Sequence, residues 1–436
     1  MDRTGVVVVG AGLAGLAAGA AAAGQGAGVV VVDAQRPGGR ARTTQRGAVA
    51  WNQGPHALYL GGEASRVLAA LGVRPTGGAP FVAGGRLETG GRLHVLPGGA
   101  ATLARSTALR PRSRVQLGRL LAGLGRIAPA AVAGRSTNAW FDALGLHDDA
   151  RGVVAALVRV ATYTADHDLL PAEVALAQLR LARRGVLYLD DGFGQLVAGV
   201  RGAAERAGAT VLDHDPVVEV AATPGGWMVA TASGRRWVAP AVVLAAGGAL
   251  ACAALLPAGP GRPGAWAAAG PDARVACLGV VTRRRPDPPL VFGVDEPLYL
   301  STHCPPARLA PDGLVVVEVM RYRTTAETGD RHGDRAQLEG LLGRAGVAPD
   351  DVVDARYLHD MPAVRGVPDP AVGLAGRPPV AVGGADGLFV AGDWAGPAGW
   401  LADASLASGE AAGLLAAAAW SSGATPVAPP DRTLAR

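Results

Sequence analysis

The 436-residue sequence predicts an α/β fold, in which a doubly wound parallel sheet is assembled from three separated segments and a second α+β domain is interleaved between them. Three observations support this prediction. Residues 5–33 show a strand, glycine turn, helix and strand in succession, and further strand patterns at 242–246 and 388–391 each run into glycine. Residues 274–323 contain three strand candidates, which favours an antiparallel sheet in the second domain.

The N-terminal run from Gly5 to Val32 contains no charged residue. Its 28 residues exceed the roughly 20 that a transmembrane helix needs. However, eight of them are glycine and a valine block stands at each end, and such β-branched runs favour strands. A secretory signal would need a basic start and a shorter apolar region. The run is therefore interpreted as a strand, a turn, a helix and a second strand.

The turn is a GxGxxG fingerprint, Gly10 to Gly15, and Asp33 follows the last glycine by 18 residues. The first glycine permits the tight turn, the second lets backbone approach a diphosphate, and the third lets the helix pack against the strand. The acid can accept hydrogen bonds from a ribose. We expect a dinucleotide site at Gly10, Gly12, Leu13, Ala14, Gly15, Asp33 and Ala34. The alternative is a glycine-tolerant βαβ unit without a ligand.

Composition excludes several classes of function. The three cysteines are far apart and form no metal or disulfide pattern, which suits a reducing cytoplasm and predicts no metal site. All 41 basic residues are arginine, so no mechanism can use a lysine base or Schiff base. Aromatic residues make up only 4% of the chain and no nucleic-acid motif accompanies the arginines, so we expect no nucleic-acid partner.

Basic residues are concentrated between Glu88 and Asp142, a stretch without acidic residues. If residues 112–127 are helical, four leucines share one face and three arginines, Arg112, Arg119 and Arg126, line the opposite one. Such a helix can contact an anionic membrane surface, or it can be an ordinary domain helix with a solvated arginine face. Salt-sensitive flotation with anionic liposomes would distinguish the two. The expected location is thus the cytoplasm, with peripheral membrane contact as an open alternative.

The remaining pattern predicts the other elements and the domain boundaries. We expect helices at 63–71, 195–207, 335–345 and 402–419, the last capped near Asp403, with helical patterns across 112–184 and hairpins at 80–97. Further strands are expected at 210–212, 217–221, 227–231 and 352–358. One domain would comprise residues 1–85, 190–260 and 380–420, and the other residues 86–189 and 261–379. Residues 421–436 are expected to be a mobile tail.

Three motifs occur in the order typical of one superfamily. They are GAGLAGL with Asp33, GGRARTT at 38–44, and GLFVAGDWAGPAGWLADASLASGEAAG at 387–413. A fourth, weaker one is DDGFGQLVAGVRGAAERAGATV at 190–211. With these, the chain resembles the flavin amine oxidase and phytoene desaturase superfamily over most of its length, and within it the bacterial phytoene-dehydrogenase-like oxidoreductases.

The resemblance implies a glutathione-reductase-like domain that binds FAD non-covalently. It implies that the GGR segment passes beside the pyrophosphate and ribityl chain, that the residue at Asp393 contacts the same region, and that the helix from Asp403 points its N-terminus at the ring. The further cofactor-binding residues that it implies are Gly38, Gly39, Arg40, Gly54, Pro55, His56, Val218, Gly392, Asp393, Leu401, Ala402 and Ala404.

Departures from the superfamily pattern bear on activity. Amine oxidases usually keep a lysine near the flavin and two aromatic residues around the substrate. This chain has no lysine, and Trp394 and Trp400 could supply aromatic faces or fill a core. His56 and Trp400 are the candidate catalytic residues, ahead of Tyr163 and Tyr188, although a lone histidine is more often structural. A base is not demanded if the flavin simply takes a hydride.

The expected activity is hydride transfer from a substrate carbon to flavin N5, which desaturates a small lipophilic or neutral secondary metabolite. The expected electron acceptor is oxygen, a quinone or an unidentified molecule, because only one dinucleotide fingerprint is present. An amine or amino acid oxidase is the main alternative. Two further alternatives are a non-redox flavin-dependent isomerase and a binding protein like the prenylated-GTPase dissociation inhibitors.

Overall fold

The computed structural model describes residues 2–257, 266 and 269–423. Its centre is a five-stranded parallel sheet in the order β11-β3-β2-β15-β21. Its strands are β2 (Val6–Val9), β3 (Val29–Val32), β11 (Thr210–Leu212), β15 (Ala241–Leu244) and β21 (Leu388–Val390). These strands come from the beginning, middle and end of the chain, so the doubly wound sheet predicted from three separated segments is confirmed. The domain boundaries themselves stay a prediction.

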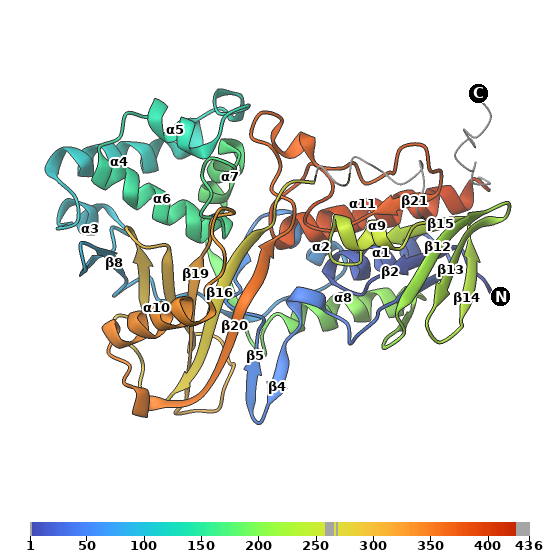
Figure 1. The fold of residues 1–436 in the computed structure, drawn as a ribbon, viewed down its shortest axis with the longest axis horizontal. Coiled ribbons are helices and arrows are strands. Elements are labelled where there is room, and N and C mark those ends of the chain that lie inside the picture. The colour runs from blue at the N-terminus through green and yellow to red at the C-terminus, as the bar shows by residue number, and fades with distance from the viewer. Residues whose placement is uncertain (1, 258–265, 267–268, 424–436) are drawn as a thin grey trace.

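Helices cover one face of this sheet and a small antiparallel sheet covers the other (Figure 1). The helices are α1 (Leu13–Gly24), α2 (Glu63–Ala70), α8 (Gly194–Arg206) and α11 (Ala402–Ser421). The small sheet contains β12 (Val217–Thr223), β13 (Gly226–Thr231) and β14 (Arg236–Ala239), with β1 (Asp2–Arg3) parallel to β14, and α9 (Ala249–Ala254) lies beside it. Burying both faces explains why β2 and β3 are continuous valine runs.

The second sheet is seven-stranded, in the order β20-β16-β19-β18-β17-β8-β9, and all its pairs are antiparallel except β17 with β8. Its strands are β8 (Arg86–Thr89), β9 (Arg92–Val95), β16 (Ala273–Thr282), β17 (Leu290–Gly293), β18 (Leu298–Cys304), β19 (Val315–Tyr322) and β20 (Val352–Val364). Helix α10 (Arg331–Arg344) covers one face. The predicted antiparallel sheet is thus present.

A helical layer packs against the other face of the seven-stranded sheet, at the upper left of Figure 1. It contains α3 (Ala100–Ala104), α4 (Pro111–Gly123), α5 (Thr137–Ala143), α6 (Asp148–Thr162) and α7 (Ala172–Ala182). Two small sheets complete the fold: β6 (Leu58–Tyr59), β10 (Val186–Leu189) and β7 (Gly77–Gly78) form one, and the hairpin of β4 (Thr44–Arg46) with β5 (Val49–Trp51) forms the other.

Several local predictions need correction. Of the hairpins predicted over 80–97, the structure forms one, in which Gly90-Gly91 joins β8 to β9, and Gly84-Gly85 precedes β8. The helix expected over 112–127 ends as α4 at Gly123 and continues as a short 3-10 turn. Its leucines point inward as expected, and Arg112, Arg119 and Arg126 are exposed. Of the tail predicted to be mobile, residues 424–436 lie outside the described residues, and Ser421 is the last residue of α11.

Membrane contact by α4 stays a prediction. Within the described ranges, no helix combines the length and apolarity needed to cross a bilayer. The same part of the chain holds no group of three or more His, Cys, Asp or Glu that could bind a metal ion, and its three cysteines are buried and free.

Helices α1 and α11 approach each other closely because two glycines of α11 face the backbone of α1. A Cβ atom at Gly413 would lie 2.2 Å from the carbonyl oxygen of Ala18, and one at Gly409 would lie 2.2 Å from that of Ala14. We expect Gly413→Ala to lower the free energy of unfolding by about 1–3 kcal/mol, because a backbone atom cannot move aside as a side chain can.

Gly24→Ala is the matched control for Gly413→Ala. Gly24 ends α1, and a Cβ there would meet nothing within 4 Å. We expect this variant to be neutral or more stable by up to about 1 kcal/mol, because alanine reduces the freedom of the unfolded chain. Urea denaturation measures both, and equal stabilities of the two variants would contradict the close-packing argument.

Candidate functional site

A cavity of about 480 Å³ opens at the carboxyl ends of the parallel strands and extends to the seven-stranded sheet. Its lining begins at the glycine turn after β2 and at Asp33 after β3. It ends at Tyr163, Val275 and Met320, which belong to the helical layer and the second sheet. The crevice beyond the carboxyl ends of parallel strands is the usual ligand site of such sheets. Both halves of the protein therefore build one site.

Each glycine of the fingerprint has a physical role in this structure. Gly10 has φ +108°, and a Cβ there would lie 2.4 Å from the carbonyl oxygen of Ala245. A Cβ at Gly15 would lie 1.8 Å from the carbonyl oxygen of Gly10, so Gly15 allows α1 to approach β2 and does not line the cavity. Gly12 has nothing within 4 Å on its side-chain side. Backbone at Gly12 is thus open to a ligand at the N-terminus of α1.

Asp33 lines the cavity next to Ala34, and both positions agree with the expected ribose end of a dinucleotide. One carboxylate oxygen accepts a hydrogen bond from the backbone N–H of Ala11 at 2.6 Å, and the other accepts one from Gln35 at 2.8 Å. A carboxylate can accept about four hydrogen bonds, so capacity for a ligand remains.

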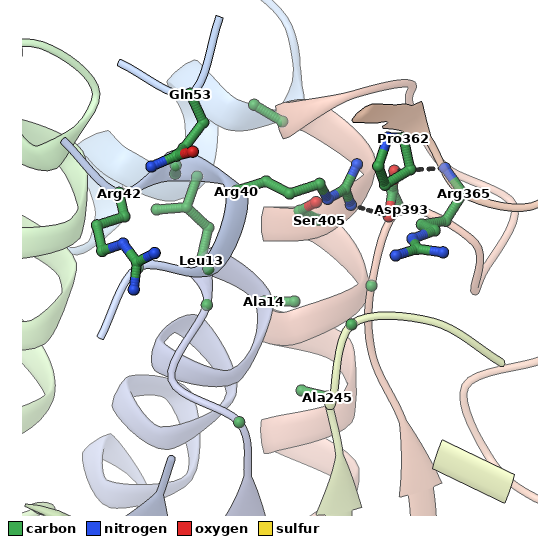
Figure 2. A pocket seen from close by; sticks show the side chains of 18 of the residues that line it. Leu13, Ala14, Arg40, Arg42, Gln53, Ala245, Pro362, Arg365, Asp393 and Ser405 are labelled. Atoms are coloured by element: carbon green, nitrogen blue, oxygen red, sulfur yellow. Dashed lines mark hydrogen bonds and ion pairs between the residues drawn. The ribbon is translucent and has the colours of Figure 1, made fainter. Parts of the chain in front are cut away.

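The Gly38-Gly39-Arg40 segment lies over the glycine turn, where the backbone N–H of Gly38 donates to the carbonyl oxygen of Ala11 at 2.8 Å. Arg40 forms an ion pair with Asp393 at 2.5 Å and also donates to the carbonyl oxygen of Ala363 at 3.0 Å (Figure 2). The second oxygen of Asp393 accepts from the backbone N–H of Arg365 at 3.0 Å. Gly39, Arg40, Gly392 and Asp393 all line the cavity.

The N-terminus of α11 reaches the cavity through Leu401, Ala402 and Ser405, while Ala404 is buried behind them. Leu401 has φ +55°, a strained value for a leucine, and such strain is concentrated at functional sites. The expectation that Asp403 caps α11 is wrong. Its buried carboxylate accepts a hydrogen bond from the backbone N–H of Ala64 at 2.5 Å and so caps α2.

His56 lines the cavity with Pro55, in contact with Phe193 at 4.7 Å between ring centroids. Its Nδ1 lies 2.9 Å from the carbonyl oxygen of Gly54. Because a carbonyl can only accept, the ring hydrogen of the neutral imidazole lies on Nδ1. Burial, with a smaller effect of the Arg40 charge, lowers the pKa of His56. The imidazole is therefore neutral at pH 7 and can take up a proton.

The end of the cavity farthest from Asp33 is apolar. It is formed by Tyr163, Phe193, Val275, Met320, Met361 and Leu401. Sequence reasoning missed all of these except Leu401 and Tyr163, because single apolar residues in strands carry no local signal. The register of β16, β19 and β20 brings Val275, Met320 and Met361 together, whereas Phe193 directly precedes α8.

Several predicted positions lie outside the cavity. Val218 is 57% exposed, and its neighbour Val217 lines the cavity instead, because successive side chains of β12 point to opposite faces. Trp400 is buried in the helical layer, where its Nε1 donates to the carbonyl oxygen of Thr162 at 2.9 Å, so the structure does not place it at the reacting atoms. Gly54 packs behind the wall, against Cys277 and Met361. Trp394, in contrast, lines the cavity.

The charged residues of the lining are mainly basic. Arg36, Arg40, Arg42 and Arg365 line it, against the carboxylates Asp33 and Asp393. All six lie toward the glycine turn or beside Asp393, and none stands among the apolar residues at the far end. One half of the cavity therefore suits an anion and the other an uncharged group.

Comparisons with known proteins agree with this geometry. Residues 8–71 match the family of NAD(P)-binding Rossmann-like domains. No curated protein matches the sequence closely enough to be a relative. Among solved structures, cyclohexylamine oxidase from Brevibacterium oxydans is 18% identical, with 97% of this chain and 99% of that chain covered and a TM-score of 0.67.

Two further structures are similar. An oxidoreductase from Methanosarcina mazei is 16% identical, with 92% of this chain and 98% of that chain covered and a TM-score of 0.67. A Rab GDI from Plasmodium falciparum is 10% identical, with 89% and 93% covered and a TM-score of 0.58. At these identities the likeness establishes a shared fold, and that fold occurs both in oxidases and in a GDI.

The buried carboxyl of Asp403 should make stability depend on pH. Burial raises its pKa from 3.8 to about 6, so between about pH 4 and pH 6 the folded state holds a proton that the unfolded chain has released. The contribution of Asp403 to stability therefore falls as the pH rises through this window. Asp403→Asn keeps an acceptor for Ala64. Relative to the wild type, its free energy of unfolding should rise by about 2–3 kcal/mol as the pH goes from 4 to 7. Urea denaturation at each pH measures the difference, and a constant difference would contradict the prediction.

Proposed function

We propose that the protein is an FAD-dependent oxidoreductase that removes a hydride and a proton from neighbouring carbons of an apolar or neutral substrate. The observation that carries the proposal is the single cavity, which runs from a complete dinucleotide turn to an apolar chamber. A cofactor with a dinucleotide tail and a reactive ring would span both parts. Non-covalent binding is proposed because no cysteine lines the cavity described here.

The residues fit such a cofactor. Gly12 is open to a diphosphate at the N-terminus of α1, and the arginine-rich lining offers positive charge beside it. Asp33 retains acceptor capacity for a ribose, and Arg40 with Asp393 stands midway along the cavity. The N-terminus of α11 supplies a positive dipole end where a reduced ring would carry negative charge. When bound, FAD would supply a two-electron acceptor.

The apolar chamber supports a neutral substrate. No carboxylate stands among the lining residues at that end, and an ammonium group would normally be met by one. Carbon–carbon desaturation releases a proton as well as a hydride, so it needs a proton acceptor. His56 is neutral and lines the cavity, and we assign it that role. This favours a phytoene-dehydrogenase-like desaturation of a lipophilic or secondary-metabolite substrate.

An amine oxidase is the second candidate. The observation that favours it is the extensive structural likeness to cyclohexylamine oxidase, whose name specifies a small apolar amine. A neutral amine could enter the chamber without a carboxylate, and its oxidation to an imine needs no strong base. A third candidate is a non-catalytic binding role, which the structural likeness to a Rab GDI supports.

The test is anaerobic titration of the FAD-reconstituted protein with polyenes and terpenoids in one series and primary amines and amino acids in another, followed by visible absorbance. We expect the oxidised-flavin band to bleach with a polyene or terpenoid and to persist with amines. Bleaching by amines alone would contradict the proposed desaturation and support amine oxidation instead. A protein that takes up no FAD would refute the oxidoreductase proposal and favour the binding role.

The role of His56 predicts a pH dependence of substrate-driven flavin reduction. Because the pKa of His56 lies below its ordinary 6.5, the rate should be constant from pH 7 to 8 and fall as acidic pH protonates the imidazole. His56→Asn keeps a donor for Gly54 and should slow reduction by about 10²–10⁴-fold when FAD is saturating. Stopped-flow absorbance measures the rate. An unchanged rate in the variant would remove His56 from the mechanism.

A further inference from the structure

Glu318 is a buried carboxyl for which the site as described has no use. Its residue is 3% exposed, and Arg356 is a charged group that acts on its carboxyl. The small void that it lines with Trp51 and Arg356 has no room for a water molecule. Burial raises the pKa of Glu318 to about 8, so the group is mostly neutral at pH 7. A buried carboxyl of this kind calls for an explanation.

The sheet register places Glu318 beside Arg356. Gly279 of β16 pairs with Glu318 of β19 on one side and with Arg356 of β20 on the other. A Cβ at Gly279 would lie 3.1 and 3.2 Å from the two carboxyl oxygens of Glu318. The carboxyl group therefore lies over the glycine, on the way to Arg356. Both side chains line the same small void, next to the row of Cys277 and Met320.

Arg356 nevertheless forms its hydrogen bonds with residues other than Glu318. Its guanidinium donates to the carbonyl oxygen of Asn52 at 3.1 Å and to Oε1 of Gln53 at 2.7 Å. Gln53 lines the cofactor cavity, and Figure 2 shows it projecting from its loop toward the space over Leu13 and Arg40. Because Arg356 occupies Oε1, the amide nitrogen of Gln53 remains as a donor with no partner of its own among the described residues.

We propose that Gln53 is a ligand-binding residue whose amide nitrogen donates a hydrogen bond to an acceptor atom of the bound flavin, and that Arg356 is the positioning residue that orients it. The inference rests on the proposed function, since it takes FAD as the ligand. Together with Glu318 these residues form what we call the Gln53–Arg356–Glu318 unit. As a neutral acid, Glu318 leaves Arg356 free to hold residues 52–53.

The same geometry makes the unit sensitive to alkaline pH. A charged Glu318 would attract the Arg356 guanidinium away from Gln53, because an ion pair to a carboxylate is stronger than a bond to an amide. The other charged or titratable groups near the pair are Cys277 on β16, Tyr188 on β10, and Arg42 and Arg46 next to Arg356. The pKa values of Cys277 and Tyr188 are raised, so both stay neutral while Glu318 ionises.

The experiment measures the dissociation constant of FAD by fluorescence quenching, together with the absorption spectrum of bound flavin. Gln53→Met removes the donor and should weaken FAD binding about five- to tenfold and shift the flavin band. Arg356→Met should have a similar effect, and the double variant should be no weaker than either single one, because both remove the same bond. Gln45→Met, on the exposed strand β4, is the control and should bind as the wild type does.

Glu318→Gln isolates the pH effect. We expect this variant to bind FAD as the wild type does at pH 7. Between pH 7 and 9 the dissociation constant of FAD should rise for the wild type and stay constant for the variant. Circular dichroism and thermal unfolding establish that each variant is folded. Wild-type affinity and an unshifted spectrum in Gln53→Met, or identical pH profiles of wild type and Glu318→Gln, would overturn the inference. If the wild type itself binds no FAD, the proposed function fails instead.

Discussion

The ion pair between Arg40 and Asp393 is the contact on which the site depends. It joins the loop after β3 to the loop after β21, which are 353 residues apart in the chain. The same two residues also hold the end of β20, because Arg40 donates to the carbonyl oxygen of Ala363 and Asp393 accepts from the backbone of Arg365. The parallel sheet and the seven-stranded sheet are thereby fixed against each other across the cavity. A partly buried, hydrogen-bonded pair of this kind is costly to break from one side.

The two ends of the cavity differ in chemistry because different layers build them. Turns that follow parallel strands supply free backbone amides, glycines and arginines, which suit a charged ligand. The far end is made by side chains in the middle of antiparallel strands and at the end of α6, where apolar residues are buried as core. A ligand with a charged tail and a flat apolar ring matches this sequence of environments from one end to the other.

Two features separate this protein from a generic member of its fold. It has no lysine, so proton transfer at the site must use another group, and His56 is the neutral histidine that faces the cavity. It also carries strain at the chamber, because Tyr163 and Leu401 both have positive φ and both line it. The surrounding structure must hold these two residues in place.

The sequence by itself determined the features that depend on local backbone geometry. A tight turn at Gly10, the close approach at Gly15 and the acid after β3 must occur at fixed spacings within about 30 residues, so they leave a readable pattern. The separate motifs around Arg40 and Asp393 were recognisable through their resemblance to a known superfamily. Only the tertiary structure decided which of Val217 and Val218 faces the cavity, that Trp400 packs away from it, and that Asp403 caps α2. The chamber and the Gln53–Arg356–Glu318 unit were also beyond the sequence, because cross-strand register unites residues that are tens to hundreds of positions apart and individually look like ordinary strand or loop residues.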